Sequence, residues 1–191
     1  MGNKNTMVLV MAALIVGLIA GILGPKMFGG KPQGTSIVPA GSPPPAQMPS
    51  ADYTLKINEL NRVLEQNPNN VAVLVQLGNT YFDANQYLES IAAYEKALAL
   101  KPGNPDVLTD LGVMYRRNGQ PNEAVKRFQE AMMASPTHLQ SRFNLGIVLH
   151  FDLNDSVGAR QALEDFLRIS STGTQADQVR QLLATLPPAG G

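Results

Sequence analysis

The residue types that perform most enzyme chemistry are scarce in this chain of 191 residues. It has no cysteine and only two histidines, His138 and His150, which lie at the two ends of one predicted helix. A zinc site needs a cluster of histidine, cysteine and carboxylate ligands, and the sequence shows none. It also lacks a glycine-rich phosphate loop, a Gly-x-Ser-x-Gly turn and a Cys-x-x-Cys-His haem-attachment motif.

One stretch begins like a calcium-binding loop. Asp152, Asn154 and Ser156 have the alternate spacing of the first ligands of such a loop. Val157 then stands where the loop needs glycine, and Leu163 stands where the bidentate glutamate belongs. We therefore reject a metal site and predict a non-enzymatic protein with no cofactor and no small-molecule substrate.

The charged residues are unevenly distributed, although the formal net charge is zero. Residues 1–50 contain Lys4, Lys26 and Lys31 and no acid, so acids outnumber bases in the remainder of the chain. A mildly acidic domain without a basic stripe is a poor nucleic-acid binder. We expect no nucleic-acid partner.

Two ladders of residues recur at an interval of 34 positions. The prolines are Pro68, Pro102 and Pro136, and the glycines are Gly78, Gly112 and Gly146. Leucines precede the glycines, and aromatic residues recur at Tyr81 and Tyr115 and at Tyr94 and Phe128. A period of 20 to 50 residues is typical of a repeat array.

Each repeat is predicted to contain two helices. Leu74, Leu77 and Tyr81 form an apolar stripe at helical spacing in the first half, and Ile91 and Tyr94 begin another in the second half. A glycine inside the first helix costs about 1 kcal/mol relative to alanine. We therefore expect the backbone of the partner helix to come close to each of these glycines.

The third repeat departs from this pattern. Its small residue, Ala159, arrives one position late, which predicts a one-residue insertion between His150 and Val157. Arg142 replaces the bulky apolar residue found at Leu74 and Leu108. Terminal repeats are often atypical in this way.

Further helices flank the repeats. The apolar stripe of residues 52–66 has the phase of a lone second-half helix that covers the first repeat. Residues 175–186 form a C-terminal cap, and Thr174 with Asp177 predicts a capping box at its start. The predicted helices are 52–66, 71–83, 87–100, 105–117, 121–134, 138–150, 155–169 and 175–186.

From about residue 70 to residue 169 the chain resembles the tetratricopeptide repeat family. The resemblance rests on the order of the recurring residues: Leu-Gly, an aromatic, a small residue, an aromatic, alanine and proline. The resemblance implies an all-α helix–turn–helix solenoid that holds other proteins. It divides the domain 51–186 into repeats at about 71–104, 105–138 and 139–173. It further implies that first-half helices line a concave groove.

The residues at the family's inward positions form the predicted partner-binding groove. They are Val75, Asn79, Phe82, Asp83, Thr109, Val113, Arg116, Arg117, Phe143, Ile147 and His150. Arg116 and Arg117 suit a peptide that carries an acidic group; ordinary packing of Val113 and Ile147, or a solvated arginine pair, is an equally weighted alternative. Chaperone-binding members of the family use a Lys/Asn/Asn/Lys/Arg clamp. The matching residues are Val75, Asn79, Asp110, Gln140 and Asn144, of which only Asn79 agrees, so a co-chaperone role is disfavoured.

The N-terminal residues predict a membrane anchor. Residues 5–25 carry no charge, and residues 7–23 are all apolar or glycine. This is near the minimum length for a transmembrane helix, and a cleaved signal peptide is the alternative. We favour an uncleaved anchor, residues 1–26, followed by a flexible Pro/Gly/Ser-rich linker, residues 27–50. Within the anchor, Ala13, Gly17 and Gly21 have the small-xxx-small spacing of helix dimers.

The stretches 77–83, 111–119 and 143–150 resemble bacterial membrane-tethered repeat proteins, some of which are similar to the repeat domains of cytochrome c-type biogenesis factors. The resemblance implies a single-pass protein of the bacterial inner membrane with an extracytoplasmic domain that binds a protein or peptide. The alternative is a structural scaffold that self-associates through the transmembrane helix. Residues 187–191 are expected to be a disordered tail.

Overall fold

The computed structural model describes residues 51–187. The predicted anchor, the linker, Ala13, Gly17, Gly21 and the tail beyond Pro187 lie outside the described residues. The described part consists of eight helices and contains no strand. The helices are α2 (Ala51–Gln66), α3 (Val71–Asp83), α4 (Tyr87–Leu100), α5 (Pro105–Arg117), α6 (Pro121–Ala134), α7 (Leu139–Phe151), α8 (Ser156–Ile169) and α9 (Thr174–Thr185). Each end lies within one residue of its predicted position.

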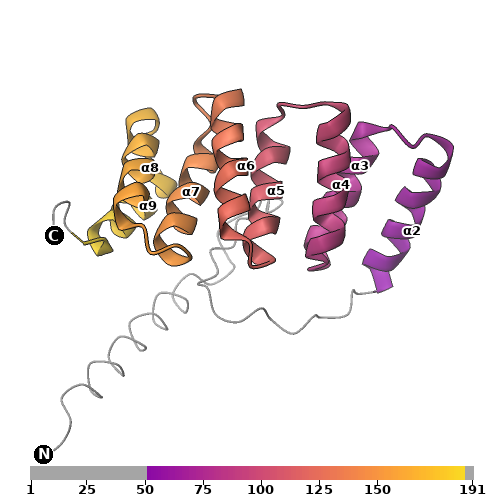
Figure 1. Ribbon diagram of the computed structural model, residues 1–191, viewed down its shortest axis with the longest axis horizontal. Helices are drawn as coiled ribbons and strands as arrows, with labels where there is room; N and C mark the ends of the chain where they lie inside the picture. The colour runs from indigo at the N-terminus through magenta and orange to yellow at the C-terminus, as the bar shows by residue number, and fades with distance from the viewer. Residues whose placement is uncertain (1–50, 188–191) are drawn as a thin grey trace, which may run out of the picture. The chain divides into compact units, whose positions relative to one another are not determined.

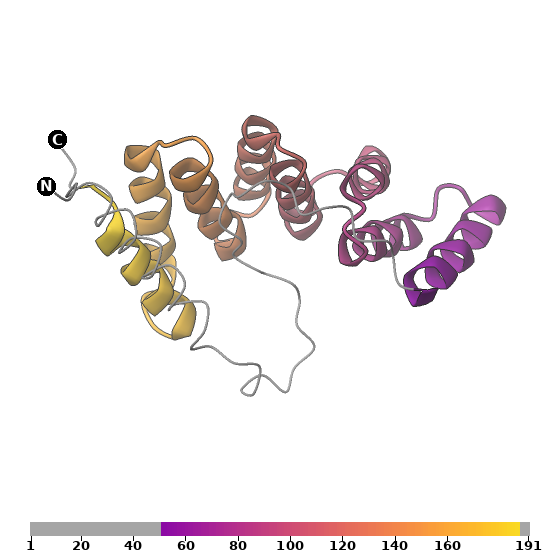
Figure 2. The same cartoon turned by 90° about the horizontal axis from the view of Figure 1, so that it is seen from below.

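The helices follow one another in chain order along one direction (Figures 1 and 2). The most extensive contacts join α3 to α4, α5 to α6 and α7 to α8, which are the two halves of each predicted repeat. The next contacts join each second-half helix to the following first-half helix. The apolar clusters span these junctions, so the core is continuous from repeat to repeat. The predicted all-α repeat solenoid is confirmed.

The repeating glycines make room for side chains rather than for backbone. A Cβ atom on Gly78 would lie 2.6 Å from Cε1 of Tyr94, and one on Gly112 would lie 2.5 Å from Cε1 of Phe128. Gly146 faces Leu163 in the same way. The expectation that backbone approaches these glycines was therefore wrong. A large side chain of the second-half helix occupies the space instead.

A third ladder marks the starts of the first-half helices. Asn70, Asn104 and His138 are again 34 residues apart and are the N-cap residues of α3, α5 and α7. Each side chain accepts a hydrogen bond from a backbone N–H three residues later, at 3.2 to 3.3 Å. Such caps satisfy backbone donors that the helix itself leaves free.

The insertion in the third repeat lies in the turn between α7 and α8. The turns within the repeats each contain one residue with left-handed backbone, Asn85, Gly119 or Asn154. The first two are 34 residues apart and the last two are 35 apart, whereas α5 and α7 end at positions 34 apart. The additional residue therefore belongs to the turn at Asp152 and Leu153, inside the predicted interval.

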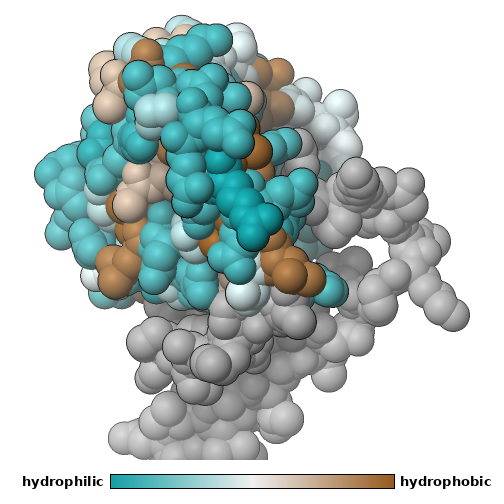
Figure 3. All heavy atoms as spheres, turned by 90° about the vertical axis from the view of Figure 1, so that its right-hand side faces the viewer, coloured by the Kyte–Doolittle hydropathy of each residue, from teal (hydrophilic) through white to brown (hydrophobic). Residues whose placement is uncertain are grey.

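The terminal helices close the array differently. α2 packs against α3 through Leu60, as predicted, whereas Leu55 and Val63 are exposed. Seen from the α2 end, hydrophilic residues dominate, with apolar side chains scattered among them (Figure 3). α9 has no capping box, because Thr174 is the first helical residue and Gly173 occupies the N-cap. That part of the prediction was wrong.

α9 occupies the place of a fourth first-half helix. It starts 35 residues after α7, which gives Gln181 the position of Gly146. The residues that would face a second-half helix, Asp177, Arg180, Gln181 and Ala184, are all exposed. Across residues 51–187, no helix has the length and apolar character needed to cross a membrane.

Candidate functional site

The predicted groove residues divide into a packed group and an accessible group. Thr109, Phe143 and Ile147 are only 2 to 3% exposed. Phe143 and Ile147 belong to the apolar cluster that contains Val179 of α9, so the terminal helix covers them. Val75, Phe82 and Val113 are partly buried beside the core cluster shared by the first two repeats. These side chains join successive repeats, which is the packing alternative stated above.

The accessible residues of α3, α5 and α7 lie on the side opposite the second-half helices. Spacings of four and seven residues place them on one face of each helix. We call this face the inner surface; it comprises Asn79, Asp83, Asp106, Asp110, Arg117, Gln140 and Asn144. Three of its members were predicted as groove residues, and three others were named only in the clamp comparison.

Tyr94 orients the amide of Asn79. The phenol Oη of Tyr94 donates a 2.7 Å hydrogen bond to Oδ1 of Asn79, so the amide nitrogen points away from this contact. Burial, followed by the negative charge of Asp110, raises the pKa of Tyr94 and keeps its hydroxyl protonated. The sequence pattern identified Tyr94 as a core residue but did not reveal this polar contact.

Arg116 is not a free anchor for a partner's carboxylate. Its Nε donates to Oδ2 of Asp152, and its Nη2 lies 3.4 Å from Oδ1 of the same carboxylate. The two side chains are only 14% and 11% exposed. Asp152 is the C-cap residue of α7, so the pair links the end of α5 to the end of α7. Of the two arginines predicted to bind a partner's carboxylate, Arg116 is therefore already paired within the protein.

Arg117 and His150 flank this link. The guanidinium of Arg117 lies over the Phe82 ring, 5.5 Å from its centroid, which is a cation–π arrangement. The His150 ring contacts Phe151, and its Nδ1 is shut off from water without a hydrogen-bond partner in the described part of the chain. Arg117 is thus the cation that the predicted groove presents on the inner surface.

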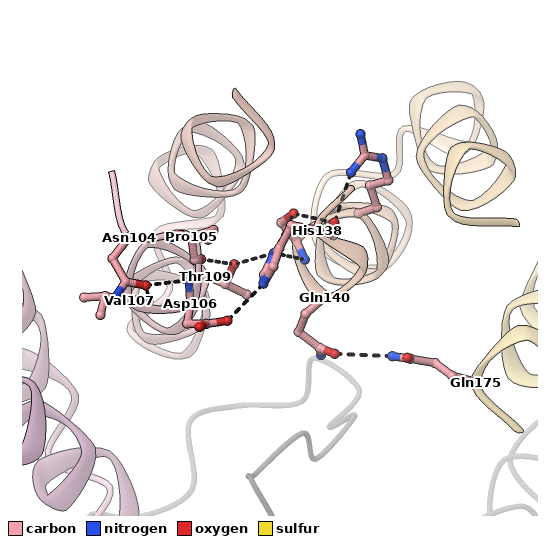
Figure 4. A network of polar contacts seen from close by, with 10 residues as sticks. Asn104, Pro105, Asp106, Val107, Thr109, His138, Gln140 and Gln175 are labelled. Carbon is pink, nitrogen blue, oxygen red and sulfur yellow. Dashed lines mark hydrogen bonds and ion pairs between the residues drawn. The ribbon is translucent and has the colours of Figure 1, made fainter. Parts of the chain in front are cut away.

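His138, at the start of α7, contacts Ser141 of its own helix and Asp106 of α5; His138 and Asp106 are labelled in Figure 4. Nδ1 of His138 is 3.1 Å from Oγ of Ser141, and Nε2 is 3.1 Å from Oδ1 of Asp106. The order matches a hydrolase triad, but Ser141 is completely buried and its hydroxyl donates to the carbonyl of His138. His138 is also the N-cap of α7. The trio therefore holds the helix start and contacts α5, and a substrate cannot reach its serine.

Several polar groups on the inner surface lack partners. Nε2 of Gln140 and Nδ2 of Asn144 are shut off from water and form no hydrogen bond within residues 51–187. Oε1 of Gln140 does accept a bond from Gln175 of α9, at 3.3 Å (Figure 4). Buried donors without partners are rare because each costs about 1–3 kcal/mol. The folded chain therefore leaves hydrogen-bonding capacity of Gln140 and Asn144 unused within residues 51–187.

Asp110 stands at the position of Asn144 in the preceding repeat and has no ion-pair partner within residues 51–187. Its side chain remains open to water, but the surrounding helices displace solvent from part of its environment. This desolvation, together with the negative charge of Asp106, raises the pKa of Asp110 to about 7. No group of three or more metal-ligating residues exists in the described part.

Two family models match the sequence over overlapping stretches. A model described as TPR repeat matches residues 78–119, and one described as tetratricopeptide repeat matches residues 109–174. The chain carries tetratricopeptide repeats. Both matches fall within the helical array of residues 51–187.

Solved tetratricopeptide structures share the fold. The crystal structure of MamA is 24% identical with a TM-score of 0.64, and the match covers 69% of this chain and 77% of that one. A tetratricopeptide repeat protein from Parabacteroides merdae ATCC 43184 is 19% identical with a TM-score of 0.63, covering 69% and 52%. Such low identities establish the fold alone. No curated protein sequence matches the chain.

A third structure invites comparison at the inner surface. It is the first TPR of Spaghetti (RPAP3) bound to the HSP90 peptide SRMEEVD, 23% identical with a TM-score of 0.53, covering 60% of this chain and 94% of that one. In the present tetratricopeptide array, Asp110 adds negative charge near Asn79. Gln140 and Asn144 add neutral amides. The inner surface therefore has a different charge pattern from the cationic clamp described above.

Proposed function

We propose that this protein is a non-catalytic interaction module that binds an extended segment of a partner protein on its inner surface. The observation that carries the proposal is the pair of unsatisfied amide donors on α7, Nε2 of Gln140 and Nδ2 of Asn144. Amide side chains spaced along successive helices can bind the carbonyl groups of an extended peptide backbone. Asn79 offers a similar group, held in orientation by Tyr94.

The charges of this surface favour a peptide that has a positive group near α5. Asp83, Asp106 and Asp110 are all exposed, and Asp110 has no cation beside it in the described chain. A lysine or arginine of the partner would stabilise the charged form of Asp110. Arg117 adds one cation at the other end of α5. It supports a ligand of mixed charge and is the remaining candidate for the predicted carboxylate contact.

The decisive experiment is site-specific photo-crosslinking of the full-length protein in its native membrane. A crosslinker at Gln76, which lies on the exposed side of α3, should capture the partner, whereas one at Asn122 on α6 should not. Asn144→Ala should weaken the Gln76 crosslink about tenfold, as expected for one peptide hydrogen bond. Equal capture from Asn122, or capture unaffected by Asn144→Ala, would contradict the proposal.

We also propose that residues 1–26 anchor this module in a bacterial inner membrane with the repeats outside the cytoplasm. The uncharged run of residues 5–25 supports it. A narrower proposal, biogenesis of c-type cytochromes, has the sequence resemblance as its sole support. Haem staining of membranes from a deletion strain tests it, because unchanged cytochrome levels would exclude that role.

A further inference from the structure

Arg142 is a buried cation at a position that holds leucine in the other two repeats. It lies 34 residues after Leu108 and 68 after Leu74, which are both buried core residues. Arg142 itself is only 9% exposed. Removing a guanidinium from water is costly unless an anion or hydrogen-bond acceptors replace the solvent. Its partners therefore need to be accounted for.

Half of the Arg142 guanidinium has no partner. Nη1 donates a 3.0 Å hydrogen bond to the carbonyl of His138. Nε is shut off from water and unpaired, and Nη2 forms no hydrogen bond within residues 51–187. Nε and Nη2 together form the edge of a guanidinium that grips a carboxylate with two parallel bonds.

Another arginine of this protein, Arg116, binds a carboxylate through this edge. Arg116 presents Nε and Nη2 to the two oxygens of Asp152. Arg142 presents the same two atoms, and no carboxylate of residues 51–187 pairs with them. Burial lowers the pKa of Arg142, and the positive charge of Arg168 lowers it further. Arg168 is itself paired with Asp165.

The repeat also indicates where this edge lies. Leu108 is on the floor of a groove of about 510 Å³ between α4 and α6, with Leu98, Leu111 and Met133 among its lining residues. Because Arg142 is the equivalent of Leu108, repeat equivalence places it at the corresponding position between α6 and α8. Arg168 is the equivalent of Met133 there, which fits its electrostatic effect on Arg142. Met133 and the Arg168 side chain are each 74% exposed, so both can move when a ligand enters.

We propose that the groove over Leu108 and the equivalent position beside Arg142 together bind an acidic segment of a partner protein. A carboxylate side chain pairs with Nε and Nη2 of Arg142, and an apolar side chain enters the groove over Leu108. The groove over Leu108 is lined mainly by apolar residues, together with Glu95, Arg127 and Glu130. Its apolar part and the unpaired cation at Arg142 select an aspartate or glutamate with an apolar residue nearby. A bare phosphate ion would use only the cation. This site lies between second-half helices, with Leu108 of α5 and Arg142 of α7 beneath them, and does not include the inner-surface residues.

The first test measures the stability of the full-length protein without ligand. Arg142→Leu restores the residue type of the other repeats and removes an unpaired buried charge, so it should raise the midpoint of thermal unfolding by at least about 3 °C. Arg62→Leu, at an exposed position of α2, is the matched control and should change the midpoint by less than about 1 °C. A lower midpoint for Arg142→Leu would mean that the folded chain already compensates this charge, and would overturn the proposal.

The second test measures binding directly by nitrogen-15 NMR of the arginine Nε–H groups. The probes are acetylated, amidated peptides with one leucine and one glutamate, in either order, separated by two, three or four alanines. At least one should shift the Arg142 Nε–H resonance. Replacing its glutamate by glutamine, or Arg142 by leucine, should weaken binding at least tenfold, whereas Asn144→Ala should leave it unchanged.

Each alternative outcome is decisive. No shift with any peptide up to about 5 mM would overturn the site, and so would equal binding of the glutamine peptide. A shift caused by inorganic phosphate but by no peptide would overturn the partner assignment. Because the inner-surface variant is measured in parallel, loss of this site and loss of the proposed inner-surface function give different results.

Discussion

Gly112 and Phe128 illustrate how one missing methyl group determines the spacing of a helix pair. The ring of Phe128 is completely buried and lies where a Cβ of residue 112 would be. The same arrangement recurs at Gly78 with Tyr94 and at Gly146 with Leu163. The glycine ladder and the ladder of large side chains are therefore two halves of one contact.

Gly112→Leu should lower the free energy of unfolding by about 1–3 kcal/mol, because the added side chain overlaps the buried ring. Urea unfolding followed by circular dichroism measures the change. Ala92→Leu, at an exposed position of α4, is the control and should have little effect. If Gly112→Leu were as stable as wild type, the Phe128 ring would have to be free to move.

Asp110 makes stability depend on pH. Its pKa is about 7 in the folded protein, against an ordinary value of 3.8, so between these values the folded state holds a proton that the unfolded state has released. The favourable contribution of protonated Asp110 is therefore complete below about pH 4 and is lost as the pH rises through 7.

Asp110→Asn removes this dependence. The variant should be more stable than wild type at pH 8 and similar to it at pH 4.5, as measured by urea unfolding at both pH values. Asp52→Asn, at an exposed position of α2, is the control for loss of one surface carboxylate. An equal effect of Asp110→Asn at the two pH values would contradict the raised pKa.

At the scale of elements, the turn between α7 and α8 has a function beyond connection. Asp152, the C-cap residue of α7, pairs with Arg116 and so ties the third repeat to the preceding one. Neighbouring repeats normally interact through their apolar faces. Here a partly buried ion pair adds a polar link between them.

Asp152→Ala should therefore destabilise the protein by about 1.5–3 kcal/mol, the range for hydrogen bonds to charged groups. Arg116→Ala should cost a similar amount, and the double variant should cost less than the sum, because each single change leaves one partner unpaired. Chemical unfolding of all three variants gives the coupling energy. Arg117→Ala is the control and should lose about 0.5–1 kcal/mol through its contact with Phe82. Additive effects at Arg116 and Asp152 would show that the pair contributes nothing.

The sequence predicted the helices more completely than the surfaces. Helix positions followed from the period of the apolar residues, which packing between repeats enforces. Burial of Phe143 and Ile147 was harder to foresee, because it depends on α9 covering the last first-half helix. The Arg116–Asp152 pair was also missed, since these residues are 36 positions apart and meet only because the ends of α5 and α7 lie close together in the folded array. The N-cap ladder of Asn70, Asn104 and His138 was readable from the sequence and was overlooked.

At the scale of the whole molecule, the remaining question is how the repeat array is held in the cell. If residues 1–26 form an uncleaved anchor, the full-length protein should stay in the membrane fraction after alkaline washing. N-terminal sequencing should then find a start at or near Met1. A mature start beyond residue 20 would identify a secretion signal instead.

Protease added to spheroplasts should remove the repeats, and protection would place them in the cytoplasm.

α9 also restricts how an array of this kind can grow by gene duplication. A fourth second-half helix added after it would have to pack a large aromatic side chain against Gln181, where the other repeats have glycine, and beside the exposed Asp177 and Arg180. A duplicated unit is accommodated only upstream of Thr174, between existing repeats. Engineered versions with longer binding surfaces should therefore be built by internal insertion, with the last twelve-residue helix kept as the terminus.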